Sequence, residues 1–166
     1  MTSERRAPDT LPRRAVNPVI RGLTGFPLAL AQIGAGLFGA AGAPARAQHR
    51  IAARFGRLAP ASGRPGNLRS LGHGLAVLVP SLIGFFLAVV VVYLVWAGWL
   101  YPLRPDTFGY LSHPFTVDHG LDGSWGGPTL IGAWFIHAMS SLGMQLVCLA
   151  AITGLTRLQD NLTRRL

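Results

Sequence analysis

The sequence predicts an all-α membrane protein whose centre is a transmembrane helical hairpin. Two long runs without Asp, Glu, Lys or Arg indicate this fold, residues 75–100 and residues 129–155. The first run has 26 residues, so as a helix it would reach about 39 Å, more than the roughly 30 Å hydrocarbon core of a bilayer. In water this helix would be apolar all round, and a chain of 166 residues has too little other material to cover it.

The distribution of charge predicts which ends of these spans face the cytoplasm. All 15 basic side chains are arginine, six residues are acidic, and the formal net charge is +9. Residues 1–73 hold 11 of the arginines, the segment 101–128 has a net charge of −2, and the tail from Arg157 has +2. Basic segments beside apolar spans follow the positive-inside pattern and bind anionic lipid. We therefore predict a multi-pass protein of the cytoplasmic membrane with a cytoplasmic C-terminus, membrane lipids as partners and no nucleic-acid binding.

The amino-terminal region leaves several alternatives open. Residues 1–21 are polar, contain three prolines and show no period, so we expect a disordered cytoplasmic arm. Residues 22–43 are uncharged and long enough to span, but six of them are glycine, which weakens insertion. The segment is interpreted as a third span, as a re-entrant or interfacial helix, or as a signal peptide ending near Ala45. Cleavage there would export five arginines before the next span, against the usual charge bias.

Residues 45–58 have the period of a basic amphipathic helix. Ile51, Phe55 and Leu58 fall on one helical face, and four arginines fall on another. Such a helix is expected to lie on the cytoplasmic leaflet with its guanidinium groups on lipid phosphates, or else to pack on a partner protein. Pro and Gly then break the pattern, so residues 59–70 are predicted to be a linker. The four arginines are called the basic stripe below: Arg46, Arg50, Arg54 and Arg57.

The first predicted span, residues 75–100, has a small-residue pair and an aromatic end. Gly84 and Ala88 lie one helical turn apart, a spacing that lets another helix approach closely. Amphipathic rings collect where acyl chains meet headgroups, so the aromatic end marks the outer interface. These rings belong to Tyr93, Trp96, Trp99 and Tyr101.

Residues 101–128 are predicted to form an extracytoplasmic loop of turns, since Pro, Gly, Asp and aromatic residues dominate them. At 28 residues the loop is long for a bare connector, which favours ligand contact there. Two imidazoles and two carboxylates within ten residues offer the N and O ligands of a divalent metal, although they are also ordinary loop residues. These weak metal candidates are His113, Asp118, His119 and Asp122. No cofactor is predicted.

The second predicted span, residues 129–155, has a polar face made by His137, Ser141 and Gln145 at intervals of four. Polar groups in hydrocarbon seek partners, so this face is expected to point into a helix bundle or an oligomer contact. His137 is the one ionisable side chain inside a predicted span, and it acts either as a hydrogen-bonded structural group or as a ligand or proton relay. Residues 156–166 are expected to continue the helix briefly on the cytoplasmic side.

Several of these segments resemble a known family. The stretch LVWAGWLYPLRPDTFGYLSHPFTVDHGLDGSWGGPTLIGAWFIHA and the ending RLQDNLTRRL are similar to the second half of the actinobacterial multi-pass membrane "sensor" domain found ahead of histidine kinases. LTGFPL at residues 23–28 resembles the start of its first membrane segment, and the basic helix resembles the one closing its first half. The first half is shortened here, and neither a phosphoacceptor-histidine helix nor an ATP lid follows. The resemblance therefore implies no kinase activity and transfers no catalytic residue.

Together these observations predict a small sensory or regulatory membrane module that is not an enzyme. The outer loop would receive an input, and the cytoplasmic basic segments would couple it to a partner such as a histidine kinase of a two-component system. A structural accessory subunit of a larger membrane complex is the alternative. A membrane enzyme or transporter using His137 is a third hypothesis, disfavoured because neither span holds a carboxylate, a lysine or an arginine.

Overall fold

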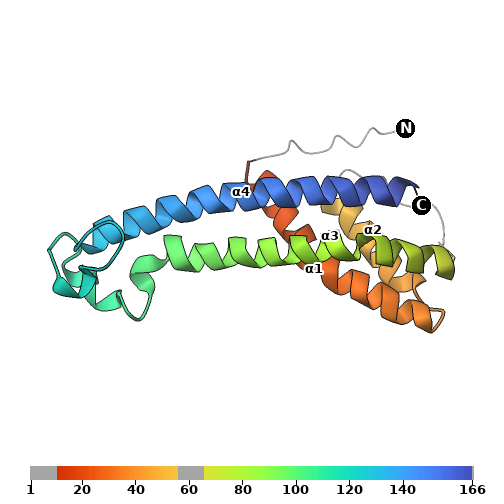
Figure 1. Ribbon diagram of the computed structural model, residues 1–166, viewed down its shortest axis with the longest axis horizontal. Helices are drawn as coiled ribbons and strands as arrows, with labels where there is room; N and C mark the ends of the chain where they lie inside the picture. Colours follow the sequence, from red (N-terminus) through yellow and green to blue (C-terminus); the bar gives the residue numbers. More distant parts are fainter. Residues whose placement is uncertain (1–10, 56–65, 166) are drawn as a thin grey trace, which may run out of the picture. The chain divides into compact units, whose positions relative to one another are not determined.

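The structure, a computed structural model, describes residues 11–55 and 66–165 (Figure 1). The described residues form helices, turns and loops, with no strand among them, and the prediction of an all-α fold is confirmed. The four α-helices are α1 (Leu11–Leu37), α2 (Gly42–Phe55), α3 (Asn67–Leu94) and α4 (Leu130–Arg165). A π-helical turn, η1 (Val95–Trp99), follows α3, and three short 3-10 helices follow it: η2 (Tyr101–Leu103), η3 (Phe108–Ser112) and η4 (His119–Leu121).

The helix bounds correct three sequence predictions. Helix α1 begins at Leu11, so residues 11–21 are helical and do not belong to a disordered arm; residues 1–10 lie outside the described part. Residues 22–43 are not one segment, because α1 ends at Leu37, the chain turns, and α2 begins at Gly42. Helix α3 already starts at Asn67, inside the predicted linker 59–70. The end of the predicted basic helix, residues 56–58, lies outside the described residues.

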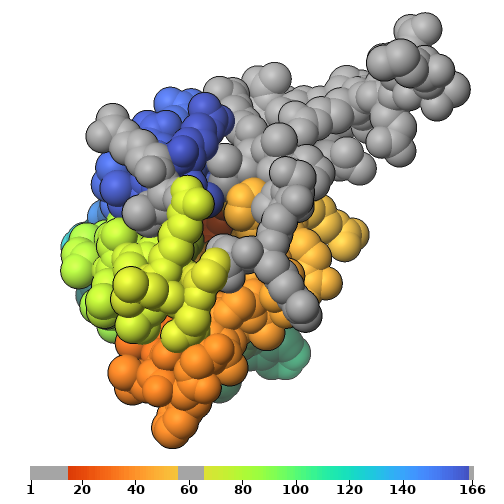
Figure 2. Space-filling view, turned by 90° about the vertical axis from the view of Figure 1, so that its right-hand side faces the viewer, coloured from red at the N-terminus to blue at the C-terminus, as the bar shows by residue number. Residues whose placement is uncertain are grey.

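The chain divides into two compact units, which are described separately. Unit 1 comprises residues up to Ala88 together with Ala151 and the residues after it, and it holds α1, α2, the first part of α3 and the end of α4. In unit 1 the side chain of Asn67 fixes the α1–α2 turn, since its Oδ1 accepts from the Ala41 N–H at 3.1 Å and its Nδ2 donates to the Gly36 carbonyl at 3.0 Å. Figure 2 shows the surfaces of α1 (orange) and of the start of α3 (yellow) side by side.

Helix α1 packs closely on α3 within unit 1. A Cβ atom at Gly22 would stand 2.8 Å from the Gly84 carbonyl oxygen and 2.9 Å from the Ala88 Cβ, so only glycine fits there without a shift. The rings of Phe26 and Phe85 lie 5.8 Å apart, centroid to centroid. The prediction that Gly84 and Ala88 admit a second helix is thus confirmed, and the second helix is α1.

Unit 2, Val89–Ala150, joins the end of α3 to the start of α4 through the predicted loop. The Leu100 N–H donates to the Val95 carbonyl, five residues back, at 3.0 Å, which is the π-helical pattern. The loop folds around a small core of Tyr101, Leu121, Leu130 and Ala133, with Tyr110 and Trp134 packed against it. The predicted loop of turns therefore consists of short 3-10 helices packed around a small hydrophobic core.

Large apolar side chains cover much of the outer surface of α3 and α4. Phe86 on α3 and Val147 on α4 are 61% and 65% exposed, and other large apolar residues along both helices are exposed as well. Among the described residues, two helices are long and apolar enough to cross a membrane, Asn67–Trp99 and Leu130–Arg164.

Candidate functional site

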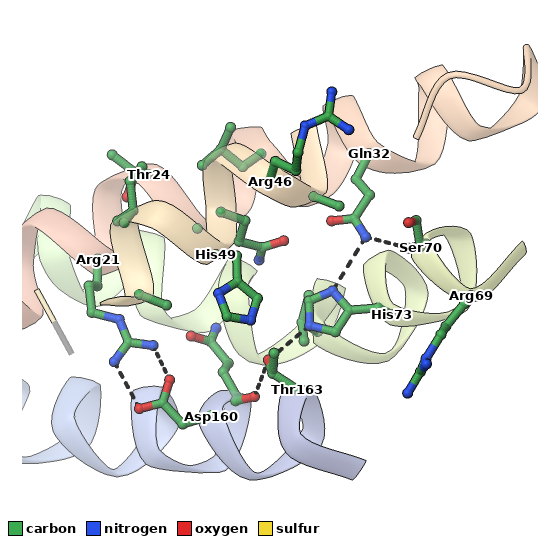
Figure 3. Close-up of a pocket in the computed structure, with 18 residues that line it drawn as sticks. Arg21, Thr24, Gln32, Arg46, His49, Arg69, Ser70, His73, Asp160 and Thr163 are labelled. Carbon is green, nitrogen blue, oxygen red and sulfur yellow. Dashed lines mark hydrogen bonds and ion pairs between the residues drawn. The ribbon is translucent and has the colours of Figure 1, made fainter. Parts of the chain in front are cut away.

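Unit 1 contains a cavity of about 340 Å³ between α1, α2, the start of α3 and the end of α4 (Figure 3). Each helix contributes residues spaced three or four apart, so one face of each helix lines the cavity. On α1 this face runs from Arg21 through Leu28 to Gln32, and on α2 it includes Gln48 and His49. The cavity therefore carries polar side chains within a lining that is largely apolar.

A chain of hydrogen bonds crosses one wall of the cavity. The buried Gln32 amide donates from Nε2 to the Ser70 carbonyl and to His73 Nδ1, the latter at 3.3 Å. His73 Nδ1 is thus an acceptor, so the proton of the neutral ring sits on Nε2, which donates to the Thr163 hydroxyl at 2.9 Å. The Thr163 hydroxyl donates in turn to the Gln159 carbonyl at 2.8 Å. The chain links α1, α3 and α4 and fixes the neutral tautomer of His73.

A buried ion pair closes another side of the cavity. The Arg21 guanidinium donates to both oxygens of Asp160, at 2.5 and 3.2 Å, and both side chains are about nine-tenths buried. Removing one partner of such a pair typically costs about 3–5 kcal/mol, because the other charge is left buried and alone. Since Asp160 is bound to Arg21, it does not neutralise the two further arginines that line the cavity.

Those arginines, Arg46 on α2 and Arg69 on α3, lie at the rim, where both are exposed to solvent. Neither has an ion-pair partner within residues 15–55 and 66–164. Inside the cavity, three buried polar atoms make no hydrogen bond to other described residues: Gln32 Oε1, Gln48 Oε1 and Ser70 Oγ. The site thus combines a cationic rim with unsatisfied acceptor oxygens, a combination able to hold an anionic group that carries hydroxyl or N–H donors.

The basic stripe is divided by this arrangement. Arg46 lines the cavity, whereas Arg50 and Arg54 lie elsewhere on the exposed surface of α2, and Arg57 is outside the described residues. The Arg54 guanidinium carbon stands 5.4 Å from the centroid of the Phe55 ring. The helical period predicts these four arginines as one lipid-facing set and gives no sign of the cavity, because Gln32 and His73 are separated by 41 residues. The sequence feature that could have indicated the cavity is Gln32, a polar residue within the uncharged segment 22–43.

The predicted metal candidates of the outer loop form two separate pairs. His113 Nε2 lies 3.4 Å from an Asp118 carboxylate oxygen, and His119 Nδ1 lies 3.0 Å from Asp122. The other Asp118 oxygen accepts the Gly120 N–H at 2.8 Å and caps η4. This backbone hydrogen bond, helped by the one from His113, lowers the pKa of the Asp118 carboxyl. Within the described loop, no three such side chains gather around one point.

The predicted polar face of α4 turns toward α3 and η1 within unit 2. His137 Nδ1 donates to the Ala133 carbonyl at 2.7 Å, and its ring stacks on Tyr101 with centroids 4.2 Å apart. Gln145 donates to the Val91 carbonyl at 3.2 Å and accepts from the Trp99 indole at 3.1 Å. Ser141 is buried against Gly98, where a Cβ atom would stand 2.1 Å from its hydroxyl. Gln145 therefore joins α4 to α3 and η1, Ser141 packs against η1, and His137 stacks on η2.

No family model, curated protein or solved structure matches the chain.

Proposed function

We propose that this chain is a small integral membrane module that senses or regulates and performs no catalysis. Its outer loop would receive an input, and its cytoplasmic basic segments would couple that input to a partner such as a two-component histidine kinase. The observation that carries the proposal is the apolar outer surface of α3 and α4. In water this surface would be a large exposed apolar area, whereas acyl chains solvate it directly.

The charges of the chain support one orientation in that membrane. Residues 1–73 carry 11 of the 15 arginines, and the end of α4 adds Arg157, Arg164 and Arg165. The loop between α3 and α4 has three aspartates and one arginine. Basic segments are retained on the cytoplasmic side, so residues 1–73 and the end of α4 would be cytoplasmic and residues 101–128 would be exposed outside.

The outer loop has the surface expected of an input site. Its small core holds a fixed backbone, while Phe108, Phe115 and Trp125 are 60%, 75% and 72% exposed. Exposed aromatic side chains on a rigid support are typical of protein and ligand contacts. In contrast, the polar groups of α4 support a structural role, since His137 and Gln145 already bond to backbone carbonyls.

Reporter fusions test the orientation. A reporter active only in the cytoplasm, fused after residue 60 or residue 166, should be active, and the same reporter after residue 115 should be silent. A reporter active only outside should give the opposite result at all three sites. Activity of the cytoplasmic reporter after residue 115 would refute the proposal.

Cross-linking and purification from native membranes test the coupling. We expect a histidine kinase to be recovered with the wild-type chain. In Phe115→Ser the response of that kinase should be lost, while the amount of the variant in the membrane stays unchanged. Val117→Ser, an apolar residue of the same loop that is 62% exposed, is the matched control and should lower the response less. Stoichiometric recovery of a respiratory or secretion complex instead would favour the accessory-subunit alternative and contradict the sensory proposal.

A further inference from the structure

We infer that the unit 1 cavity binds a phosphorylated polyol, with the phosphate at the arginine rim and the hydroxyl groups donating to the acceptors inside. This inference goes beyond the sensory proposal and holds whether or not the outer loop receives a signal. The ligand class follows from three properties of the cavity, namely its charge, its unsatisfied atoms and its size.

The charge favours an anion. Arg46 and Arg69 line the rim with long, exposed side chains and no carboxylate partner in the described residues, while the one acidic group at the cavity, Asp160, is held by Arg21. Guanidinium groups bind phosphate through paired N–H donors, and each of these arginines has its donors free of the other described side chains for such a contact. His49, whose ring has no hydrogen-bond partner among the described residues, lies between α2 and α4 beside His73 and adds a further donor (Figure 3).

The interior favours hydroxyl groups. Gln32 Oε1 and Gln48 Oε1 can only accept hydrogen bonds, and both are buried without a donor from the described residues. Gln32 cannot turn its amide to relieve this, because its Nε2 is committed to the Ser70 carbonyl and an oxygen there would face another oxygen. An apolar ligand would leave these oxygens unpaired, and a bare anion has too few donors. A polyol supplies several hydroxyl donors at once.

The size favours a headgroup. About 340 Å³ is at the lower end of small-molecule sites, enough for a sugar-like phosphate and too small for acyl chains as well. The same chemistry occurs in a phospholipid headgroup and in a soluble sugar phosphate. These two sources differ only in what is attached to the phosphate outside the rim.

Calorimetry on the full chain in phosphatidylcholine nanodiscs tests the inference, with inositol 1-phosphate and inorganic phosphate as soluble probes. We expect saturable binding, with inositol 1-phosphate tighter by about 5-fold or more, as one or two additional hydrogen bonds would give. Arg46→Ala should weaken both probes about 10-fold through loss of a charged contact. Arg50→Ala, which removes the same charge from α2 outside the cavity, should change binding less than about 2-fold. Gln48→Met should weaken inositol 1-phosphate alone.

A second arm identifies the source. Native mass spectrometry of the protein extracted from nanodiscs with phosphatidylinositol should show one retained lipid that Arg46→Ala loses and Arg50→Ala keeps, if the ligand is a lipid. Binding of the soluble probe without lipid retention would assign a soluble phosphate and equally support the site. No saturable binding in either arm, or equal losses in Arg46→Ala and Arg50→Ala, would overturn it. Because binding can also be measured in detergent, its failure is distinct from a failure of the topology fusions.

Discussion

At the scale of single residues, Gln32 shows how one polar side chain can organise an apolar segment. It is fully buried, and its amide nitrogen bonds to both Ser70 and His73. The protonated form of His73 would place a proton on Nδ1 facing the Gln32 amide hydrogens. The hydrogen bonds of this wall therefore favour the uncharged ring.

Gln32→Met is expected to destabilise the protein by about 1–3 kcal/mol, because it leaves His73 Nδ1 without a donor and removes the second hydrogen bond to the Ser70 carbonyl. Gln48→Met, of similar shape change, should cost much less, because Gln48 Oε1 has no partner to lose. Thermal unfolding in detergent, followed by circular dichroism, measures both. Equal losses would show that side-chain volume, and not the hydrogen bonds of Gln32, matters at this site.

The Asp118 cap gives the loop between α3 and α4 a predictable response to acid. Its pKa is lowered chiefly by the Gly120 N–H, so the ionised carboxylate is stabilised by the folded loop. That stabilisation is complete above the ordinary carboxyl range near about pH 3.9 and is lost as the pH falls through the lowered value. The amide resonance of Gly120, recorded by NMR from pH 7 to pH 2, should shift only in the acid range. Asp118→Asn should abolish that shift, whereas Asp122→Asn should keep it.

At the scale of helices, the contact between α1 and α3 depends on a missing side chain. Gly22 faces Gly84 and Ala88 so closely that a methyl group would press on the backbone of α3. Gly84 is less constrained, since a Cβ atom there would meet the Gly22 Cα at 3.9 Å, an ordinary contact. Gly22 and Gly84 therefore differ in how well they tolerate an added side chain.

Gly22→Ala should destabilise unit 1 by about 1–3 kcal/mol through overpacking. Gly84→Ala should be near neutral or slightly stabilising, since alanine gains up to about 1 kcal/mol of helix propensity over glycine. Denaturant titration of both variants in the same detergent compares them. A larger loss for Gly84→Ala would contradict the α1–α3 packing.

At the scale of the whole molecule, the exposed apolar surface and the arginines lie in different parts of the chain. The exposed apolar residues of α3 lie within the uncharged run 75–100, and the basic segments lie before it. A charge placed on this apolar surface would therefore be costly in lipid and would have little effect in water.

Phe86→Arg places a charge near the middle of that run, at a position 61% exposed. In a bilayer it should cost about 2.5–3.5 kcal/mol of insertion free energy and lower the level in the membrane fraction several-fold. Leu68→Arg, at a position 83% exposed before the run, should leave that level unchanged. In water both would be harmless surface changes, so equal membrane levels of the two variants would argue against insertion.

The sequence alone determined most of α2, α3 and α4 and the apolar character of two of them, whereas α1 as one helix from Leu11 to Leu37 was not predicted. Hydropathy, charge and helical period are local properties, which is why α3, α4 and most of α2 follow from residues 75–100, 129–155 and 45–58. The end of the helical stretch at Trp99, where η1 follows α3, lies one residue before the predicted boundary, because the aromatic residues and the Pro- and Gly-rich loop are contiguous.

Only the tertiary structure decided how these helices meet and what they enclose. The Arg21–Asp160 pair joins residues 139 positions apart, and the cavity takes one face from each of four helices. The turn after Leu37 depends on Asn67, which lies 26 residues beyond Ala41. Such contacts depend on distant parts of the chain, and no local pattern encodes which polar side chain will find which partner.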